Sequence, residues 1–313
     1  MTAPLAFDVV LGVLLLGVGL AAVLARDQFA AITLFIVYGL FVAIAWVRLD
    51  AVDVALAEAA IGAGLSGVLL LRAAGHLGHR HEIATSPSDD SLWRRLGTAT
   101  LCAALAGMLA LLSLSLPDEI AGLREAVDAG SAETGLRNPV TAVLLDFRGY
   151  DTLLETVVLF AALIGVWSLT PDQVWGGRPG LKEHARPDGV LASFGRLLPP
   201  IGLMIGVYLV WTGADEPGGA FQAGTVLAAV WMLAIMAGLA DAPPVSRVRL
   251  RLAVVVGPLL FVAVAVVGIL VGGFLVIPTA HTKTIILAIE TGLTLSIAAT
   301  LALLVMGRPR RPA

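Results

Sequence analysis

Long apolar stretches, separated by shorter polar ones, run through the whole chain. An α-helix needs about 20 mostly apolar residues to cross the hydrocarbon core of a bilayer. By this measure nine stretches are candidate membrane-spanning helices, and the sixth is the shortest of them. They cover residues 5–25, 29–47, 52–71, 97–116, 152–169, 197–212, 221–239, 252–271 and 285–306. The pattern predicts an all-α, polytopic integral membrane protein.

Polar segments divide these spans into groups. Segments 72–96 and 170–196 separate groups of three, two and four spans, and both are typical of linkers between independent units. A third polar segment, 117–151, is acidic and is expected to form a loop inside the middle group. We therefore expect three fused units, which occupy residues 1–80, 90–170 and 190–313.

Lysine and arginine gather in alternate loops. Cytoplasmic loops of membrane proteins carry an excess of these residues. If the N-terminus lies outside, the inner loops and the C-terminal tail hold 15 of them, against 5 in the outer loops. The sequence thus predicts an outer N-terminus and an inner C-terminus, as an odd number of spans requires.

Composition agrees with a membrane protein and excludes several other classes. The chain is 58% hydrophobic and 14% charged, whereas about a quarter of the residues of a soluble domain are charged. Its net charge of -3 gives no reason to expect nucleic acid as a partner. The only two lysines, Lys182 and Lys283, fall in loops. Without a basic side chain inside a span, the chain is expected to supply part of an ion path and not a complete one.

Four carboxylates lie inside the predicted spans or at their edges. Asp53 begins the third span and Glu58 lies deeper in it, whereas Glu155 and Glu290 belong to the fifth and ninth spans. An acid surrounded by hydrocarbon is costly, so its side chain should face a partner helix or a wet cavity. In the predicted orientation all three spans run inward, which places the acids in the outer half of the membrane. We expect them to form a proton or cation path; the alternative is structural hydrogen bonding between helices.

Two polar clusters flank these spans. Asp146, Arg148 and Asp151 directly precede the fifth span, and Asp215 and Glu216 lie in the Pro-Gly-Gly turn between the sixth and seventh. Either cluster can concentrate cations at an entrance. An ordinary solvated turn explains Asp215 and Glu216 at least as well.

Other patterns carry less functional information. The small residues from Gly62 to Gly67 favour close helix packing over a hinge or π-bulge. His76, His79 and His81 hint at a metal site, but no carboxylate or cysteine completes the set, and a solvated loop is favoured. The single cysteine cannot form an internal disulfide. With no phosphate-binding loop, nucleophile elbow or iron–sulfur pattern, neither a cofactor nor a metal is expected.

Three stretches resemble a known family. Residues 53–64, DVALAEAAIGAG, resemble the signature of the MbhD-type subunit of membrane-bound hydrogenases and Mrp antiporters. Residues 146–155, DFRGYDTLLE, resemble the MbhE-type motif, which is also found in the C-terminal part of the large MrpA subunit. The last 120 or so residues resemble MrpB, from Leu198-Pro199-Pro200 onwards and through the turn at 213–221. The chain departs from these patterns at Val52, Ala57 and Ala214, where the families usually have Pro, Thr and His.

The resemblance implies a fused accessory subunit of a multisubunit Mrp-type Na⁺ (or other cation)/H⁺ antiporter. Its three parts would be MbhD-like, MbhE-like and MrpB-like, and Glu58 and Glu155 would be proton-path residues. The implied partners are large antiporter-like subunits and small Mrp-type subunits in a bacterial or archaeal cell membrane. Any redox chemistry would belong to partner chains, so the chain itself is not expected to be an enzyme. The alternatives are a membrane component of a complex-I-like or hydrogenase-type ion pump, and a purely structural clamp.

Overall fold

The computed structural model of the chain describes residues 3–81, 92–116, 122–180 and 189–313. Within these residues, eight helical segments are long and apolar enough to cross a membrane. They are α1 (Ala3–Leu24), α2 (Gln28–Arg48), the segment Val52–Gly75, α5 (Leu92–Ser115), α8 (Gly149–Ser168), α9 (Val190–Thr212), α11 (Val248–Gly268) and the segment Thr279–Met306, which contains α12 (Thr282–Met306). The all-α, polytopic fold is therefore confirmed.

The seventh predicted span is present but short. Helix α10 (Ala220–Met236) is apolar and has 17 residues. The sixth predicted span, by contrast, belongs to α9, which has 23 residues and continues through Pro199 and Pro200. The expectation that the sixth span is the shortest was therefore wrong. The apolar pattern places the start of this helix at residue 197, but the less apolar residues 190–196 form its first two turns.

The third span is not a uniform α-helix. It consists of α3 (Val52–Ala57), a π-helix η1 (Glu58–Leu65) and α4 (Ser66–His81). The small residues at 62–67 predicted close packing rather than a π-bulge, and the structure shows both. Ala63 is 1% exposed, and a Cβ added at Gly39 of α2 would lie 3.1 Å from the Ala63 Cβ. Helix α2 thus packs tightly on the π-helix that begins at Glu58.

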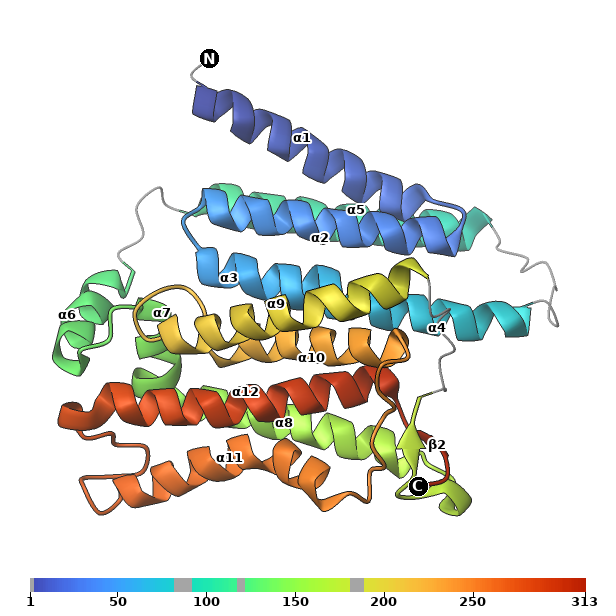
Figure 1. Cartoon of the computed structure of the whole chain (residues 1–313). Coiled ribbons are helices and arrows are strands. Elements are labelled where there is room, and N and C mark those ends of the chain that lie inside the picture. The colour runs from blue at the N-terminus through green and yellow to red at the C-terminus, as the bar shows by residue number, and fades with distance from the viewer. Residues whose placement is uncertain (1–2, 82–91, 117–121, 181–188) are drawn as a thin grey trace.

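Helix α12 is the centre of the fold. Figure 1 shows it between α9 and α10 on one side and α8 and α11 on the other, and all four contact it. In its membrane-spanning window, 72% of the residues are buried. Glycine allows the closest approach, because a Cβ at Gly257 of α11 would lie 2.8 Å from the Cα of Leu293. Small residues at helix crossings are typical of membrane bundles, where van der Waals packing drives association.

The acidic segment 117–151, predicted as a loop, is mostly helical in its described part. It contains α6 (Arg124–Thr134), the single turn α7 (Pro139–Thr141) and a second π-helix, η2 (Ala142–Phe147). Local sequence explains the breaks between them. Gly135 ends α6 in the left-handed conformation with φ 74°, and Asn138 caps α7 immediately before Pro139.

A two-stranded sheet and the ion pairs of Asp241 with Arg178 and Arg311, together called the polar clasp, lie at the end of the bundle where α8 and α12 terminate. Strands β1 (Arg178–Pro179) and β2 (Pro309–Arg311) pair antiparallel, beside the 3-10 turn η3 (Asp172–Val174). Arg311 Nη2 lies 2.7 Å from Asp241 Oδ1, and Arg178 Nη1 lies 3.7 Å from the other oxygen. The Arg311 guanidinium holds the pKa of Asp241 below its usual range. This clasp ties the C-terminal tail to the loop before α11.

Several expectations fall outside the described part of the chain. Residues 82–91 and 181–188, which belong to the two expected linkers, are not described, nor are the side chains of His76, His79 and His81. The outer N-terminus and the three-unit division stay predictions. Figure 1 does show α3, α8 and α12 running in the same direction, as the predicted orientation requires of the three acid-bearing spans.

Candidate functional site: a carboxylate cavity

A cavity of about 270 Å³ lies where α3, α8 and α12 meet η2 and the start of α10. Three of the four predicted path acids line it, namely Asp53, Glu155 and Glu290. The other lining residues are glycines and apolar residues apart from Thr141, Thr152, Thr156 and Gln222. No lysine, arginine or histidine is among the described residues that line it. The described lining of the cavity is therefore acidic, with no basic side chain to neutralise its carboxylates.

Glu290 is the most deeply buried of these acids, with 3% of its surface exposed. Its Oε2 atom is buried without a hydrogen-bond partner in the described part of the chain. The backbone amide of Ala220 faces the carboxylate. An ionised carboxylate in such surroundings is costly unless a proton or a cation compensates it. The charge of an ionised Glu290 would therefore need such compensation.

Glycines of the turn before α10 make room for Glu290. The φ angle of Gly219 is 100°, a conformation that favours glycine, and a Cβ added there would lie 2.8 Å from Glu290 Oε1. A Cβ at Gly213 would lie 3.2 Å from the same oxygen. The turn therefore closes directly over the carboxylate, and a side chain at either position would disturb it.

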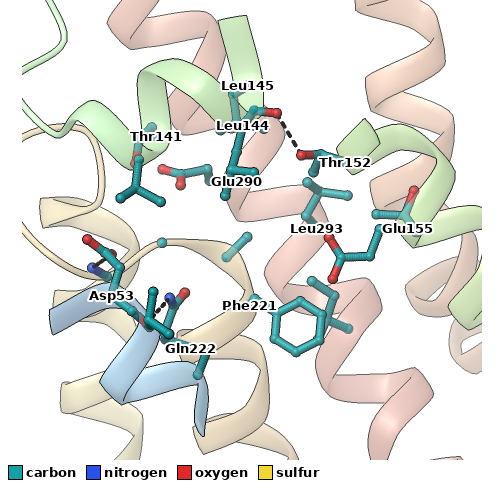
Figure 2. Close-up of a pocket in the computed structure, with 18 of the residues that line it drawn as sticks. Asp53, Thr141, Leu144, Leu145, Thr152, Glu155, Phe221, Gln222, Glu290 and Leu293 are labelled. Carbon is teal, nitrogen blue, oxygen red and sulfur yellow. Dashed lines mark hydrogen bonds between the residues drawn. The ribbon is translucent and has the colours of Figure 1, made fainter. Parts of the chain in front are cut away.

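Asp53 lies at the cavity wall, 9% exposed, and its carboxylate accepts two hydrogen bonds. The backbone amide of Gly218 donates to Oδ1 at 3.0 Å, and Nδ2 of Asn138 donates to Oδ2 at 3.4 Å. Gln222 donates in turn to the backbone carbonyl of Asp53 at 3.4 Å, a bond drawn in Figure 2. Two segments that are distant in sequence, around Asn138 and at 218–222, thus hold this acid in place.

Asn138 organises the contacts around Asp53, a role that was not predicted from the sequence. Its Oδ1 accepts from the backbone amide of Val140 at 2.8 Å, while its Nδ2 also donates to the carbonyl of Glu216 at 3.0 Å. The Asn-Pro pair at the start of a helix was the available sequence signal, since Asn is a preferred N-cap and Pro a preferred first residue. Its contact with Asp53 was not predictable from sequence spacing.

Glu155 reaches the cavity from the second turn of α8. Figure 2 shows its carboxylate directed toward Leu293 and Phe221. Unlike Asp53 and Glu290, it is exposed at the surface of this chain. Thr152, one turn earlier, donates to the carbonyl of Leu144 at 2.6 Å and joins α8 to the π-helix η2. Glu155 therefore borders both the cavity and the chain's outer surface.

The structure separates Glu58 from this group. Glu58 begins the π-helix and is not among the residues that line the cavity. Its carboxylate folds back over Gly62 of its own helix, in the space that a Cβ would occupy. The two acids of the third span, five residues apart, therefore have different surroundings.

The predicted entrance residues also have distinct surroundings. Arg148 and Asp151 form an ion pair at 2.5 Å, and Lys283 Nζ lies 2.6 Å from Asp215 Oδ1. Burial raises the pKa of Asp146. Neither these residues nor Glu216 line the carboxylate cavity. The turn that holds Asp215 has no basic residue of its own, and Lys283 at the start of α12 supplies the cation.

A second cavity, of about 250 Å³, adjoins the first. The two share Asp53, Val54 and Val140 in their walls. The second is also lined by Asp50, Arg137 and Asp215, which lie in or next to the turns at this end of the bundle. Asp53 therefore lies in the wall that the second cavity shares with the carboxylate cavity, and Asn138 lines the second cavity.

Two family models match the chain. The MbhD model, which describes the D-type subunit of MBH, matches residues 13–79. The MnhB model, which describes a domain related to the MnhB subunit of Na⁺/H⁺ antiporter, matches residues 190–308. The chain carries an MbhD domain and an MnhB-related domain. Its resemblance to Mrp-type antiporter subunits is thereby confirmed.

Curated relatives extend this finding. The probable A/B subunit of a K⁺/H⁺ antiporter from Rhizobium meliloti (strain 1021) is 28% identical over an alignment of 229 residues, and the match covers 64% of this chain and 23% of the relative. An uncharacterized protein of Methanocaldococcus jannaschii is 29% identical over an alignment of 153 residues, and the match covers 44% of this chain and 58% of the relative. The chain thus spans less than two thirds of either relative.

Solved structures share the fold. A chain of the Mrp complex from Dietzia sp. DQ12-45-1b matches with a TM-score of 0.74 and 22% identity, over 96% of this chain and 35% of that one. A chain of the archaeal membrane-bound sulfane sulfur reductase, a respiratory membrane complex, matches with a TM-score of 0.58 and 24% identity. That match covers 68% of this chain and 97% of the other.

The carboxylate cavity lies between the two matched domains. Asp53 belongs to the MbhD domain and Glu290 to the MnhB-related domain. Glu155 and Asn138 lie in the segment between them, which neither model covers. The MbhE-like nature of this middle segment stays a prediction.

Among the described residues, no group of three or more His, Cys, Asp or Glu is arranged to hold a metal ion.

Proposed function

We propose that the chain is a membrane subunit of a multisubunit cation/proton antiporter, in which the carboxylate cavity is part of the ion path. The observation that carries this proposal is the grouping of Asp53, Glu155 and Glu290 around one cavity without a basic side chain among its described lining residues. Membrane-embedded acids that face an internal cavity are typical of proton and ion pathways. The antiporter relatives support the same assignment.

The two adjoining cavities suggest the order of the path. With the N-terminus outside, the second cavity faces outward, and ions enter it beside Asp50 and Asp215 and pass Asp53 to reach Glu290. Glu155 follows, because it borders both the cavity and the exposed surface of the chain. There it passes a proton or a monovalent cation, Na⁺ or K⁺, to a partner protein.

Partner subunits are part of the proposal. On this chain, none of the residues in the membrane window of α5 is buried. We propose that the exposed surface of the chain contacts large antiporter-like subunits, small Mrp-type subunits and lipid, in a bacterial or archaeal cell membrane. The division into units 1–80, 90–170 and 190–313 is supported by the two family matches at 13–79 and 190–308. Chemistry other than transport is assigned to partner chains.

Deletion and rescue in membrane vesicles test this function. Vesicles from cells without the chain should lose Na⁺- or K⁺-dependent collapse of a pH gradient, and the intact chain should restore it. A structural clamp makes a different prediction: deletion disperses the complex, but glutamine variants of the cavity acids transport normally.

A second candidate is a membrane component of an ion-pumping respiratory complex. The match to 97% of a sulfane sulfur reductase chain favours it, since nearly that whole chain has a counterpart here. Affinity purification of the tagged chain distinguishes the two candidates. Co-purification of proteins that contain iron–sulfur or nickel centres selects the respiratory complex, whereas antiporter-like subunits alone select the antiporter.

A further inference from the structure

A groove of about 350 Å³ lies at the opposite end of the bundle from the carboxylate cavity. It runs between the last turns of α8 and the first turns of α11. Phe160, Ile164, Val254 and Val255 form an apolar wall, and Arg251 lines it together with two tryptophans. The volume falls within the range of about 300–1,000 Å³ that is usual for small-ligand sites. The groove thus combines a long apolar surface with one cation.

Arg251 is held so that most of its guanidinium is free to bind a ligand. Its Nε donates to the carbonyl of Val245 at 2.9 Å, and within the described residues its two Nη atoms have no hydrogen-bond partner. The side chain is exposed, as are Arg247 and Arg249 on the same segment. Residues 242–252 contain these three arginines and no acid. The planar guanidinium fork matches the oxygen atoms of a phosphate.

Two tryptophans lie beside this arginine. Trp175 is 57% exposed, and Trp167 is 6% exposed with its Nε1–H lacking a partner in the described part of the chain. Tryptophan is enriched at the boundary between hydrocarbon and headgroups, because its ring is apolar and its N–H is polar. The two tryptophans therefore favour a groove at the level of the lipid phosphate and ester oxygens.

We propose that this groove binds an anionic phospholipid, with an acyl chain along the apolar wall and the phosphate on Arg251. Basic pockets between membrane helices on the cytoplasmic side bind acidic headgroups. The predicted orientation places this end inside, where the arginines meet acidic lipids. The Nε1–H of Trp167 lacks an acceptor among the described residues, and an ester carbonyl of the same lipid can accept from it. Free phosphate would leave the apolar wall uncovered, and an uncharged hydrocarbon would leave Arg251 unpaired.

Native mass spectrometry of the purified full chain tests the proposal directly. Phosphatidylglycerol and phosphatidylcholine with identical acyl chains compete for the protein in detergent. The intact chain should retain phosphatidylglycerol about tenfold better, because the choline cation of phosphatidylcholine offsets the phosphate charge that Arg251 binds. Arg251→Gln should remove this preference, and Arg251→Lys should keep part of it. Arg249→Gln, which removes an arginine outside the groove, should leave it unchanged.

A second variant tests the apolar wall. Ile164→Trp fills the groove and should reduce phosphatidylglycerol retention although Arg251 is present. Equal retention of both lipids by the intact chain overturns the proposal, and so does an equal effect of the Arg249 and Arg251 variants. In the intact complex, a photoreactive residue at Val255 should capture lipid. Capture of a partner polypeptide there would show that protein covers the groove, and would overturn the proposal.

Discussion

The side-chain amide of Asn138 donates to the buried carboxylate of Asp53 across 3.4 Å. The same Asn138 caps α7, so one residue sets both a helix start and the position of a path acid. Removing the Asn138 side chain is therefore expected to lower the free energy of unfolding more than removing an ordinary N-cap. Removing a cap costs about 0.5–2 kcal/mol, and leaving a buried polar group without its partner costs about 1–3 kcal/mol more.

Asn138→Ala should therefore lower the free energy of unfolding more than Asp27→Ala, measured by thermal unfolding in detergent. Asp27 is a matched control, because it caps α2 through the amide of Ala30 at 2.8 Å and is exposed. If the two variants cost the same, the contact between Asn138 and Asp53 contributes nothing to stability.

Gly219 predicts a second stability effect. Alanine there must adopt a φ of 100° and places its Cβ 2.8 Å from Glu290 Oε1. A strained backbone position of this kind costs about 1–3 kcal/mol. Gly219→Ala should lower the unfolding temperature clearly, whereas Gly12→Ala, where a Cβ meets nothing within 4 Å, should not.

A double-variant cycle separates the strain from the clash. Because Glu290→Ala removes the oxygen that the new Cβ approaches, Gly219→Ala should cost less in that background than in the intact chain. Additive effects of the two substitutions would mean that Glu290 does not lie against the turn.

The distinct surroundings of Glu155 and Glu58 predict distinct transport effects. Glu155 lines the carboxylate cavity, and Glu58 folds over Gly62 of its own helix. Glu155→Gln should therefore abolish antiport in membrane vesicles while the complex still assembles, and Glu58→Gln should reduce it less. Unchanged transport in both variants would reject a role for either acid. A larger loss from Glu58→Gln would place the path along the π-helix instead.

The polar clasp predicts an acid-sensitive C-terminus. The pKa of Asp241 is held below its ordinary value by Arg311. The ion pair therefore contributes fully above the unfolded pKa of about 3.9, and its contribution is lost as pH falls through the lower folded pKa. Proteolytic release of the C-terminal tail should rise below about pH 4. Asp241→Asn should release it readily at neutral pH as well and remove the dependence, whereas the exposed Asp172→Asn should behave like the intact chain.

Hydropathy predicts the helices of this chain well, because hydrocarbon requires every backbone polar group to be satisfied within a helix. It predicts their ends less well. The first turns of α9, up to Arg196, are less apolar yet helical, and the segment after Arg124 reads as a loop although it folds into α6. A hydropathy pattern reveals neither π-helix, because the wider turn of a π-helix does not change how apolar the segment is.

Isolated acids inside apolar stretches were sufficient to single out Asp53, Glu155 and Glu290. Their meeting at one cavity depends on how three helices pack, which spacing along the chain does not encode. The same limit applies to Asn138 and to the ion pair of Lys283 with Asp215, since each joins segments more than 60 residues apart.

Antiport by a Glu290→Gln variant measures most directly whether the buried carboxylate carries ions. Glutamine keeps the size of the side chain but can neither release a proton nor neutralise a cation. In vesicles that contain the assembled complex, Glu290→Gln should reduce Na⁺- or K⁺-dependent proton movement about a hundredfold or more, the effect of losing one essential proton-transfer group. Glu216→Gln, at an exposed acid of the adjoining turn, should transport like the intact chain. Full transport by Glu290→Gln would contradict the proposed ion path.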